Sequence, residues 1–198
     1  KQFGRELLGV YVDDLIHACQ SDRAHQALLK SCNTQFPTTT QGTLTWILGM
    51  HVVRNRETRT LYLHQSLAIQ DFLDSWEFDS SPRDTPMHDK WSYGDDPPTT
   101  DPARKTEYRS MIGSLNHFAR CTRPDISYAV GVLCRHLHQP NENCFIAARH
   151  LMSYLASTPH LGLVYDTTAA PTDTLRLEAY CDCKRTLRGG LTLPGGSC

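Results

Sequence analysis

The 198-residue sequence lacks several features that would place it in a specialised class of protein. It has no apolar run near the roughly 18 residues that a membrane span needs, and no charged-then-apolar leader typical of secretion. Its formal net charge is only −1, so it lacks the overall basic excess of strongly basic nucleic-acid-binding domains. These absences predict an intracellular protein whose contacts with nucleic acid must be local.

The eight cysteines form no C-x-x-C pair, and none belongs to a Cys/His set with zinc-finger spacing. We therefore expect reduced and mostly buried thiols rather than a disulfide framework or a structural zinc site. The content of 39% hydrophobic and 21% charged residues is typical of one ordinary globular domain or two small ones. The sequence starts at Lys1 without a methionine, almost directly on a predicted strand, which suggests a piece of a larger protein.

Basic residues cluster at three places, although each cluster is more typical of a solvated surface than of a phosphate clamp. They are Arg54, Arg56 and Arg59; Arg104 and Lys105; and Lys184, Arg185 and Arg188.

The most informative pattern is Tyr11-Val12-Asp13-Asp14, which lies between two apolar runs. Alternating β-forming residues on both sides predict a hairpin over residues 5–18 with both aspartates at its tip. Two adjacent carboxylates can offer hard oxygen ligands to Mg²⁺, and a pair of such ions supports in-line phosphoryl displacement. Aspartate is also a common turn residue, so the pattern alone equally allows a solvated turn.

The remaining sequence predicts alternating strands and helices before an irregular segment. Ser21 is a predicted N-cap for a helix that runs to about Phe36. Residues 44–54 and 60–64 are predicted strands joined by a polar turn, and residues 65–76 a helix. Residues 79–107 are rich in Asp, Pro, Ser and Thr and are expected to form a loop or linker.

Apolar residues then recur at helical intervals over residues 107–120, 125–137 and 142–156, which predicts three packed helices. A pair of strands is predicted at 162–165 and 175–181, followed by a glycine-rich tail expected to be disordered. The fold class is therefore α+β.

Four motifs, taken in order, resemble the reverse transcriptase of copia-type LTR retrotransposons. They lie at residues 8–15, 46–50, 108–115 and 122–130, and the resemblance extends from about residue 6 to Asp182. It implies a partial polymerase palm over residues 1–78 with an antiparallel sheet and a packed helix, and a linker over 79–107. It further implies a helical thumb- or connection-like unit over 108–160, the start of a ribonuclease H-like domain with an incomplete strand pair over 161–183, and a divergent tail over 184–198.

The resemblance assigns roles to individual residues of the palm. Asp13 and Asp14 would be two of three catalytic metal ligands for two Mg²⁺ ions, with Mn²⁺ as a possible substitute. Tyr11 would lie beside the primer terminus, although it could equally be a strand aromatic that packs on its neighbour. Residues Leu48, Gly49 and Met50 resemble the primer grip, where glycine lets the backbone approach nucleic acid; an ordinary bulge glycine is the alternative.

Other residues of these motifs are expected to be structural. Trp46 and Ile47 are predicted to pack in the core. Pro124 and Asp125 suit the first turn of a helix, and a structural role for Arg123 is favoured over contact with a phosphate. His51, His64, His117 and His150 are predicted to be packed or surface residues rather than ligands.

Asp182 matches an aspartate of the ribonuclease H domain, one of four acidic metal ligands in the family. The similarity stops directly after it, and the third polymerase carboxylate of the family lies upstream of Lys1. Cys144 with Phe145 replaces the family's histidine and aromatic residue, with little expected consequence.

We therefore expect a fragment of an RNA-directed DNA polymerase that is inactive by itself, whose parent acts on a template-primer and dNTPs. The rest of the Pol polyprotein would be its partner, in the cytoplasm, within a virus-like particle, or in the nucleus. The alternative is a non-catalytic degenerate remnant or a module that binds nucleic acid or protein.

Overall fold

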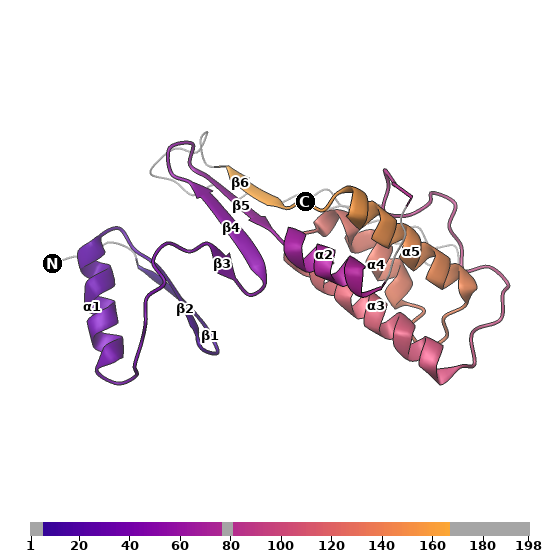
Figure 1. Ribbon diagram of the computed structural model, residues 1–198, viewed down its shortest axis with the longest axis horizontal. Coiled ribbons are helices and arrows are strands. Elements are labelled where there is room, and N and C mark those ends of the chain that lie inside the picture. The colour runs from indigo at the N-terminus through magenta and orange to yellow at the C-terminus, as the bar shows by residue number, and fades with distance from the viewer. Residues whose placement is uncertain (1–5, 77–80, 167–198) are drawn as a thin grey trace, which may run out of the picture.

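Three groups of elements lie next to one another in the computed structural model, which describes residues 6–76 and 81–166 (Figure 1). A two-stranded sheet with one helix is at one end, a four-stranded sheet lies in the middle, and four helices lie at the other end. In the described residues the two sheets are antiparallel and there are five α-helices, which confirms the predicted α+β class.

The predicted hairpin near the N-terminus is confirmed. Strand β1 (Leu7–Tyr11) pairs with β2 (Asp14–Ala18), and Tyr11 is opposite Asp14. Helix α1 (Asp22–Asn33) follows, and the Ser21 hydroxyl accepts a hydrogen bond from the Ala24 amide at 3.3 Å, as expected for an N-cap. His25 of α1 contacts His17 of β2, and the neighbouring Ala24 is buried.

The middle sheet has the strand order β3-β4-β5-β6, with bounds Trp46–Ile47, Met50–Asn55, Thr60–His64 and Leu163–Asp166. The prediction of one strand over residues 44–54 is wrong, because a two-residue turn at Leu48 and Gly49 divides it. Both residues have positive φ angles, so the chain reverses there instead of continuing. Strand β6 pairs with β5 and so returns the chain to this sheet after the helices.

The helical unit consists of α2 (Ser66–Ser75), α3 (Pro102–Cys121), α4 (Ser127–Cys134) and α5 (Glu142–Ser157), with a 3-10 turn at Pro124–Ile126. Helix α3 begins five residues before the predicted start at residue 107. The reason is local: Asp101 caps the Ala103 amide at 2.9 Å, and Pro102 suits the first helical turn. All four helices contribute to one core, whose fully buried members include Ile69, Tyr108, Leu115, Leu133, Phe145 and Leu151.

Residues 81–101 contain no helix or strand, as expected, but side-chain hydrogen bonds hold them against the helices. The Trp91 indole donates to the Asn143 carbonyl at 3.2 Å, and the Tyr93 hydroxyl donates to the Gln139 carbonyl at 2.7 Å. The Asn141 amide donates back to the Tyr93 carbonyl at 2.7 Å. The segment is therefore part of the helical unit's surface.

Some predictions lie outside the described residues: the strand at 175–181, Asp182, the basic residues of the tail and the tail itself. Of the five cysteines that the structure describes, Cys144 is buried and the other four are only partly buried. The expectation of mostly buried thiols is therefore wrong for this part of the chain.

Candidate metal-binding hairpin and nucleic-acid contacts

The tip of the first hairpin presents two adjacent carboxylates on a strained turn. Tyr11 and Asp14 are directly paired, so Val12 and Asp13 form a two-residue loop. Val12 has a φ of 49°, and Asp13 is not among the residues with positive φ, a combination that matches a type II′ hairpin turn. A β-branched residue in this region is a real outlier that costs on the order of 1–3 kcal/mol, and such strain is concentrated at functional sites.

The carboxylates of Asp13 and Asp14 suit Mg²⁺ in kind, because this ion prefers hard oxygen ligands. Two carboxylates are too few for a complete metal site. Within residues 6–76 and 81–166, no group of three or more His, Cys, Asp or Glu side chains could hold a metal ion. The described part of the chain therefore contains two candidate ligands without a third. Asp182, the other candidate, lies outside the described residues.

Tyr11 is the last residue of β1 and is 58% exposed. Its neighbours in the same hairpin, Leu7, Val10 and Val12, are also more than half exposed. The ring is thus not held in a core of the described residues and faces solvent near the aspartates. Its contact with a primer terminus remains a prediction.

The second hairpin turn joins β3 to β4 through Leu48 and Gly49, with φ angles of 49° and 77°. Two positive φ angles in a two-residue loop match a type I′ turn. A Cβ added to Gly49 would meet no atom within 4 Å, so the φ of 77°, and not a neighbouring atom, favours glycine here. Leu48 is 40% exposed, and Met50 begins β4. Contact of this turn with a primer strand stays a prediction.

Aromatic rings line one face of the middle sheet beside this turn. Trp46 contacts His51 edge to face at 4.3 Å, and His51 stacks on His64 at 5.0 Å, which in turn stacks on Tyr62 at 4.8 Å. Burial and the neighbouring His51 both lower the pKa of His64. Trp46 is 48% exposed and Ile47 is only partly buried, so the prediction that both belong to the core is wrong.

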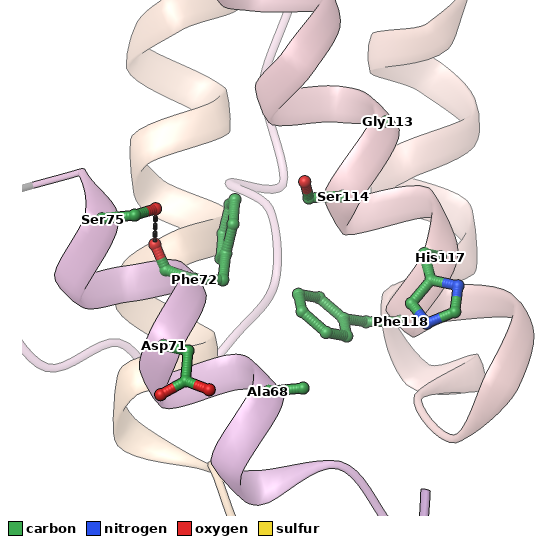
Figure 2. Close-up of a pocket in the computed structure, with 8 residues that line it drawn as sticks. All are labelled: Ala68, Asp71, Phe72, Ser75, Gly113, Ser114, His117 and Phe118. Atoms are coloured by element: carbon green, nitrogen blue, oxygen red, sulfur yellow. Dashed lines mark hydrogen bonds between the residues drawn. The ribbon is translucent and has the colours of Figure 1, made fainter. Parts of the chain in front are cut away.

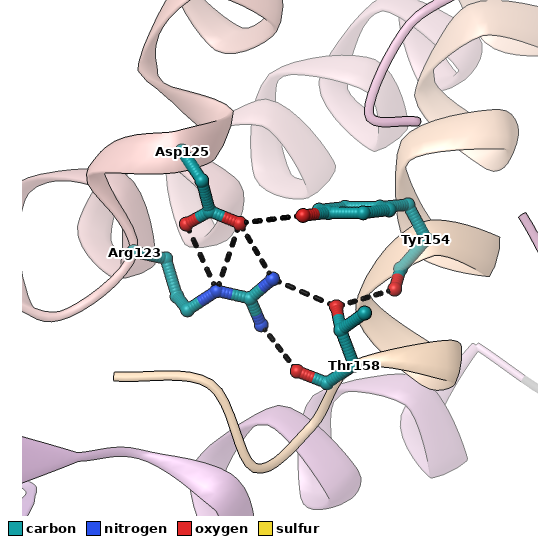
Figure 3. Close-up of polar contacts among 4 residues, drawn as sticks. All are labelled: Arg123, Asp125, Tyr154 and Thr158. Atoms are coloured by element: carbon teal, nitrogen blue, oxygen red, sulfur yellow. Dashed lines mark hydrogen bonds and ion pairs between the residues drawn. The ribbon is translucent and has the colours of Figure 1, made fainter. Parts of the chain in front are cut away.

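Arg123 lies at the centre of a polar network that joins the start of the 3-10 turn to the end of α5 (Figure 3). Its guanidinium donates to both carboxylate oxygens of Asp125, to the Thr158 carbonyl at 2.7 Å and to the Thr158 hydroxyl at 2.8 Å. The Tyr154 hydroxyl also donates to Asp125 at 2.9 Å. Because the Arg123 side chain is only 1% exposed, it cannot reach a phosphate in solvent, and its predicted structural role is confirmed.

The same contacts control the charge of Asp125. Partial burial would raise its pKa, but the hydrogen bonds and positive charge of Arg123, together with the Tyr154 hydroxyl, bring that pKa below its ordinary value. Burial and the hydrogen bond to Asp125 raise the pKa of Tyr154. The carboxylate is therefore ionised and fixed at neutral pH.

A shallow groove runs between α2 and α3, with Phe72 and Phe118 facing each other across its floor at 5.6 Å (Figure 2). His117 stands on the α3 wall and Asp71 on the α2 wall. His117 also contacts Gln65, a fully buried polar residue that accepts a hydrogen bond from Thr122. Gln65 was missed in the sequence, because a glutamine beside a helix start is usually exposed and only the tertiary structure shows its partners.

Half of the Lys and Arg residues that the structure describes lie in helices α3 to α5 and the turns between them. Residues 102–158 contain seven Lys or Arg and three Asp or Glu, a net charge of four in a chain whose total is −1. Arg109, Arg120, Arg135 and Arg149 are exposed. The balanced overall charge therefore conceals a basic segment over residues 102–158, whereas α2 adds two aspartates and residues 81–101 carry a net charge of −3.

The chain is similar to retrovirus-related Pol polyproteins of plant transposons. It is 33% identical over 158 residues to the polyprotein of transposon TNT 1-94 from Nicotiana tabacum, and 34% identical over 176 residues to that of transposon RE1 from Arabidopsis thaliana. These matches cover 77% and 87% of the chain, but the chain spans only 12% and 11% of the two polyproteins.

A shorter relative also matches. An uncharacterized mitochondrial protein of Arabidopsis thaliana is 26% identical over 174 residues, which cover 87% of the chain and 69% of that protein. No protein family model and no solved structure matches the chain. Within the described residues, no helix has the length and apolar character needed to cross a membrane.

Proposed function

Because the chain belongs to the copia-type retrotransposon Pol polyproteins and matches one segment of them, we propose that it is part of an RNA-directed DNA polymerase. Its role would be to supply two of the metal ligands and part of the template-primer contact. The rest of the polyprotein would be its partner, in a cytoplasmic particle or in the nucleus.

The observation that carries this proposal is the hairpin tip. Asp13 and Asp14 are adjacent on an exposed turn whose Val12 is held at a φ of 49°. A turn that only solvates aspartates needs no β-branched residue in a strained conformation. When two Mg²⁺ ions are bound, such carboxylates supply ligands for nucleotidyl transfer. With two ligands and no third in the described residues, we propose that this chain does not catalyse the reaction alone.

The turn at Leu48 and Gly49 and the basic segment over residues 102–158 support a contact with nucleic acid. Phosphate contacts dominate the affinity of such interfaces and make it depend on salt. A glycine turn lets a backbone strand approach closely. The template-primer would therefore lie along the turn and the exposed arginines of the helices.

The experiment is fluorescence anisotropy of a labelled RNA-DNA template-primer with the purified chain at several salt concentrations. A double variant, Arg135→Gln with Arg149→Gln, should bind less tightly and reduce the salt slope by about one for each phosphate that is no longer neutralised. The matched control, Arg23→Gln with Lys30→Gln on α1, removes two charges outside the helical unit and should change binding little. Equal reductions of affinity in both double variants, or no binding by the wild-type chain, would contradict the proposal.

A further inference from the structure

Gln65 lies at the joint between the middle sheet and the helical unit. It directly follows β5, directly precedes α2 and is completely buried. Its Oε1 accepts a hydrogen bond from the Thr122 hydroxyl at 2.9 Å, and its Nε2 lies 3.1 Å from Nε2 of His117. One side chain thus connects the end of a strand with the C-terminal end of α3.

The Thr122 hydroxyl determines which way the amide points. Thr122 is only 1% exposed, and a buried hydroxyl hydrogen requires an acceptor. Gln65 Oε1 is that acceptor. A reversed amide would present NH₂ to Thr122 and remove that acceptor. The Gln65 amide therefore donates to His117.

The donated hydrogen bond fixes the state of the His117 ring. Its Nε2 must be unprotonated to accept from Gln65, so in the neutral ring the proton is on Nδ1. Nδ1 lies 3.8 Å from Cys121 Sγ, a weak acceptor. The contacts on both sides of the ring thus agree with one neutral tautomer.

We propose that Gln65 is a positioning residue: through neutral His117 and Thr122 it fixes the middle sheet, and with it the turn at Leu48 and Gly49, against the helical unit. The link from Gln65 to the turn is short, because β5 pairs with β4 and Met50 of β4 borders the turn. Nucleic acid that contacts both the turn and the helices needs this relative position. The effect on nucleic acid rests on the proposed function, whereas the hydrogen-bond network does not.

Acidification should weaken this connection. His117 is exposed, so a proton can reach Nε2, and two donors would then face each other. The amide must turn to accept from the charged ring, and the Thr122 hydroxyl then loses its acceptor. Two titratable groups lie near the ring in the described part of the chain: Asp71, which lines the same groove (Figure 2), and Cys121 on α3.

The test is Gln65→Glu, which exchanges the donor towards His117 for an acceptor and leaves the acceptor for Thr122 in place. A carboxylate at position 65 interacts more favourably with a protonated His117. Lowering the pH should therefore strengthen template-primer binding in this variant, whereas it should weaken binding in the wild type. Relative to wild type, the variant should bind template-primer roughly three to ten times more weakly at pH 8, as for the loss of one hydrogen bond, and recover by pH 5.5. Gln70→Glu, on the exposed face of the same helix, is the matched control.

Nitrogen NMR of the His117 ring and urea unfolding complete the experiment, because neither needs nucleic acid. We expect the Nδ1-protonated tautomer in the wild type at pH 8 and an Nε2-protonated ring in Gln65→Glu. If Gln65→Glu does not fold, Thr122→Val takes its place. Template-primer binding by Thr122→Val should lack the pH dependence that wild-type binding shows.

An Nε2-protonated neutral ring in the wild type, or a Gln65→Glu pH profile that follows Gln70→Glu, would overturn the proposal. If the wild-type chain binds no template-primer while NMR shows the expected ring tautomers, the proposed function fails and the role of Gln65 in the joint stands.

Discussion

At the scale of single residues, buried polar networks rather than exposed charges determine the stability of the helical unit. Arg123 and Arg104 both pair with a carboxylate, Asp125 and Glu142 respectively. The Arg123 side chain is 1% exposed, whereas that of Arg104 is 42% exposed. Their ion pairs should therefore differ greatly in importance.

We expect Arg123→Met to lower the free energy of unfolding by about 3–5 kcal/mol, because it leaves Asp125 and the end of α5 without their partner. Arg104→Met, the matched control, should cost no more than about 1 kcal/mol, as for exposed ion pairs. Urea unfolding followed by circular dichroism measures both. Similar losses of stability in the two variants would show that the buried network has no special role.

The pKa of Asp125 predicts a pH dependence. Because the folded-state pKa is below the ordinary value, about 3.9, the unfolded chain takes up this proton first as the pH falls. The stabilisation is therefore complete well above pH 4 and is lost as the pH falls through the folded-state pKa. Asp125→Asn should flatten the dependence of the urea midpoint on pH below about 5. An unchanged slope in this variant would assign the acid sensitivity to other groups.

At the scale of elements, close approach of backbones decides where β6 joins the sheet. A Cβ added to Gly162 would lie 2.2 Å from the Leu63 carbonyl oxygen, a backbone atom that cannot move independently. By contrast, a Cβ on Gly113, within α3, would meet nothing within 4 Å. A side chain would therefore clash with the backbone at Gly162, whereas there is room for one at Gly113.

We expect Gly162→Ala to separate β6 from β5 and lower the unfolding temperature, while Gly113→Ala should stabilise the chain by about 0.5–1 kcal/mol through its helix preference. Thermal unfolding shows whether each substitution lowers or raises the unfolding temperature. Hydrogen exchange at Leu63 and Leu163 shows whether the pairing of β5 with β6 is lost. A Gly162→Ala chain with unchanged exchange at these residues would contradict this description of the joint.

Local patterns allowed most elements to be predicted, and tertiary contacts explain the misses. The alternation around Tyr11-Val12-Asp13-Asp14 predicted the hairpin, and Ser21 predicted the start of α1, because both signals are local. The local pattern predicted one strand across Leu48, because leucine is rarely found at positive φ; only the resemblance to the primer grip indicated a turn there. The pairing of β6 with β5 spans about a hundred residues of sequence, which no local pattern reveals.

The difference between local patterns and tertiary contacts also decides which residues of the candidate site could be predicted. Asp13 and Asp14 could be proposed as ligands from residue type and spacing, and Gly49 as a contact only through the family resemblance. Gln65 was not, because its importance lies in burial and in partners from α3. Trp46 was placed in the core on its residue type, yet the sheet face that carries it is half exposed.

At the scale of the whole molecule, the chain combines an exposed carboxylate hairpin with a helical unit in which residues 102–158 are basic. Leu7 and Val10 of the hairpin are 73% and 66% exposed, so this end of the molecule offers apolar surface and unpaired strand edges to a partner. The other end has a complete core. This asymmetry agrees with a polymerase segment that binds nucleic acid through its helices and completes its metal site with another part of the polyprotein.

The most direct test of this account is one gel experiment with the purified chain, a labelled RNA-DNA template-primer and dNTPs in Mg²⁺ or Mn²⁺, which records binding and extension together. The account predicts a shifted but unextended primer, with binding unchanged in Asp13→Asn. Primer extension that disappears in Asp13→Asn would contradict it, because it would show that this chain completes a catalytic metal site alone.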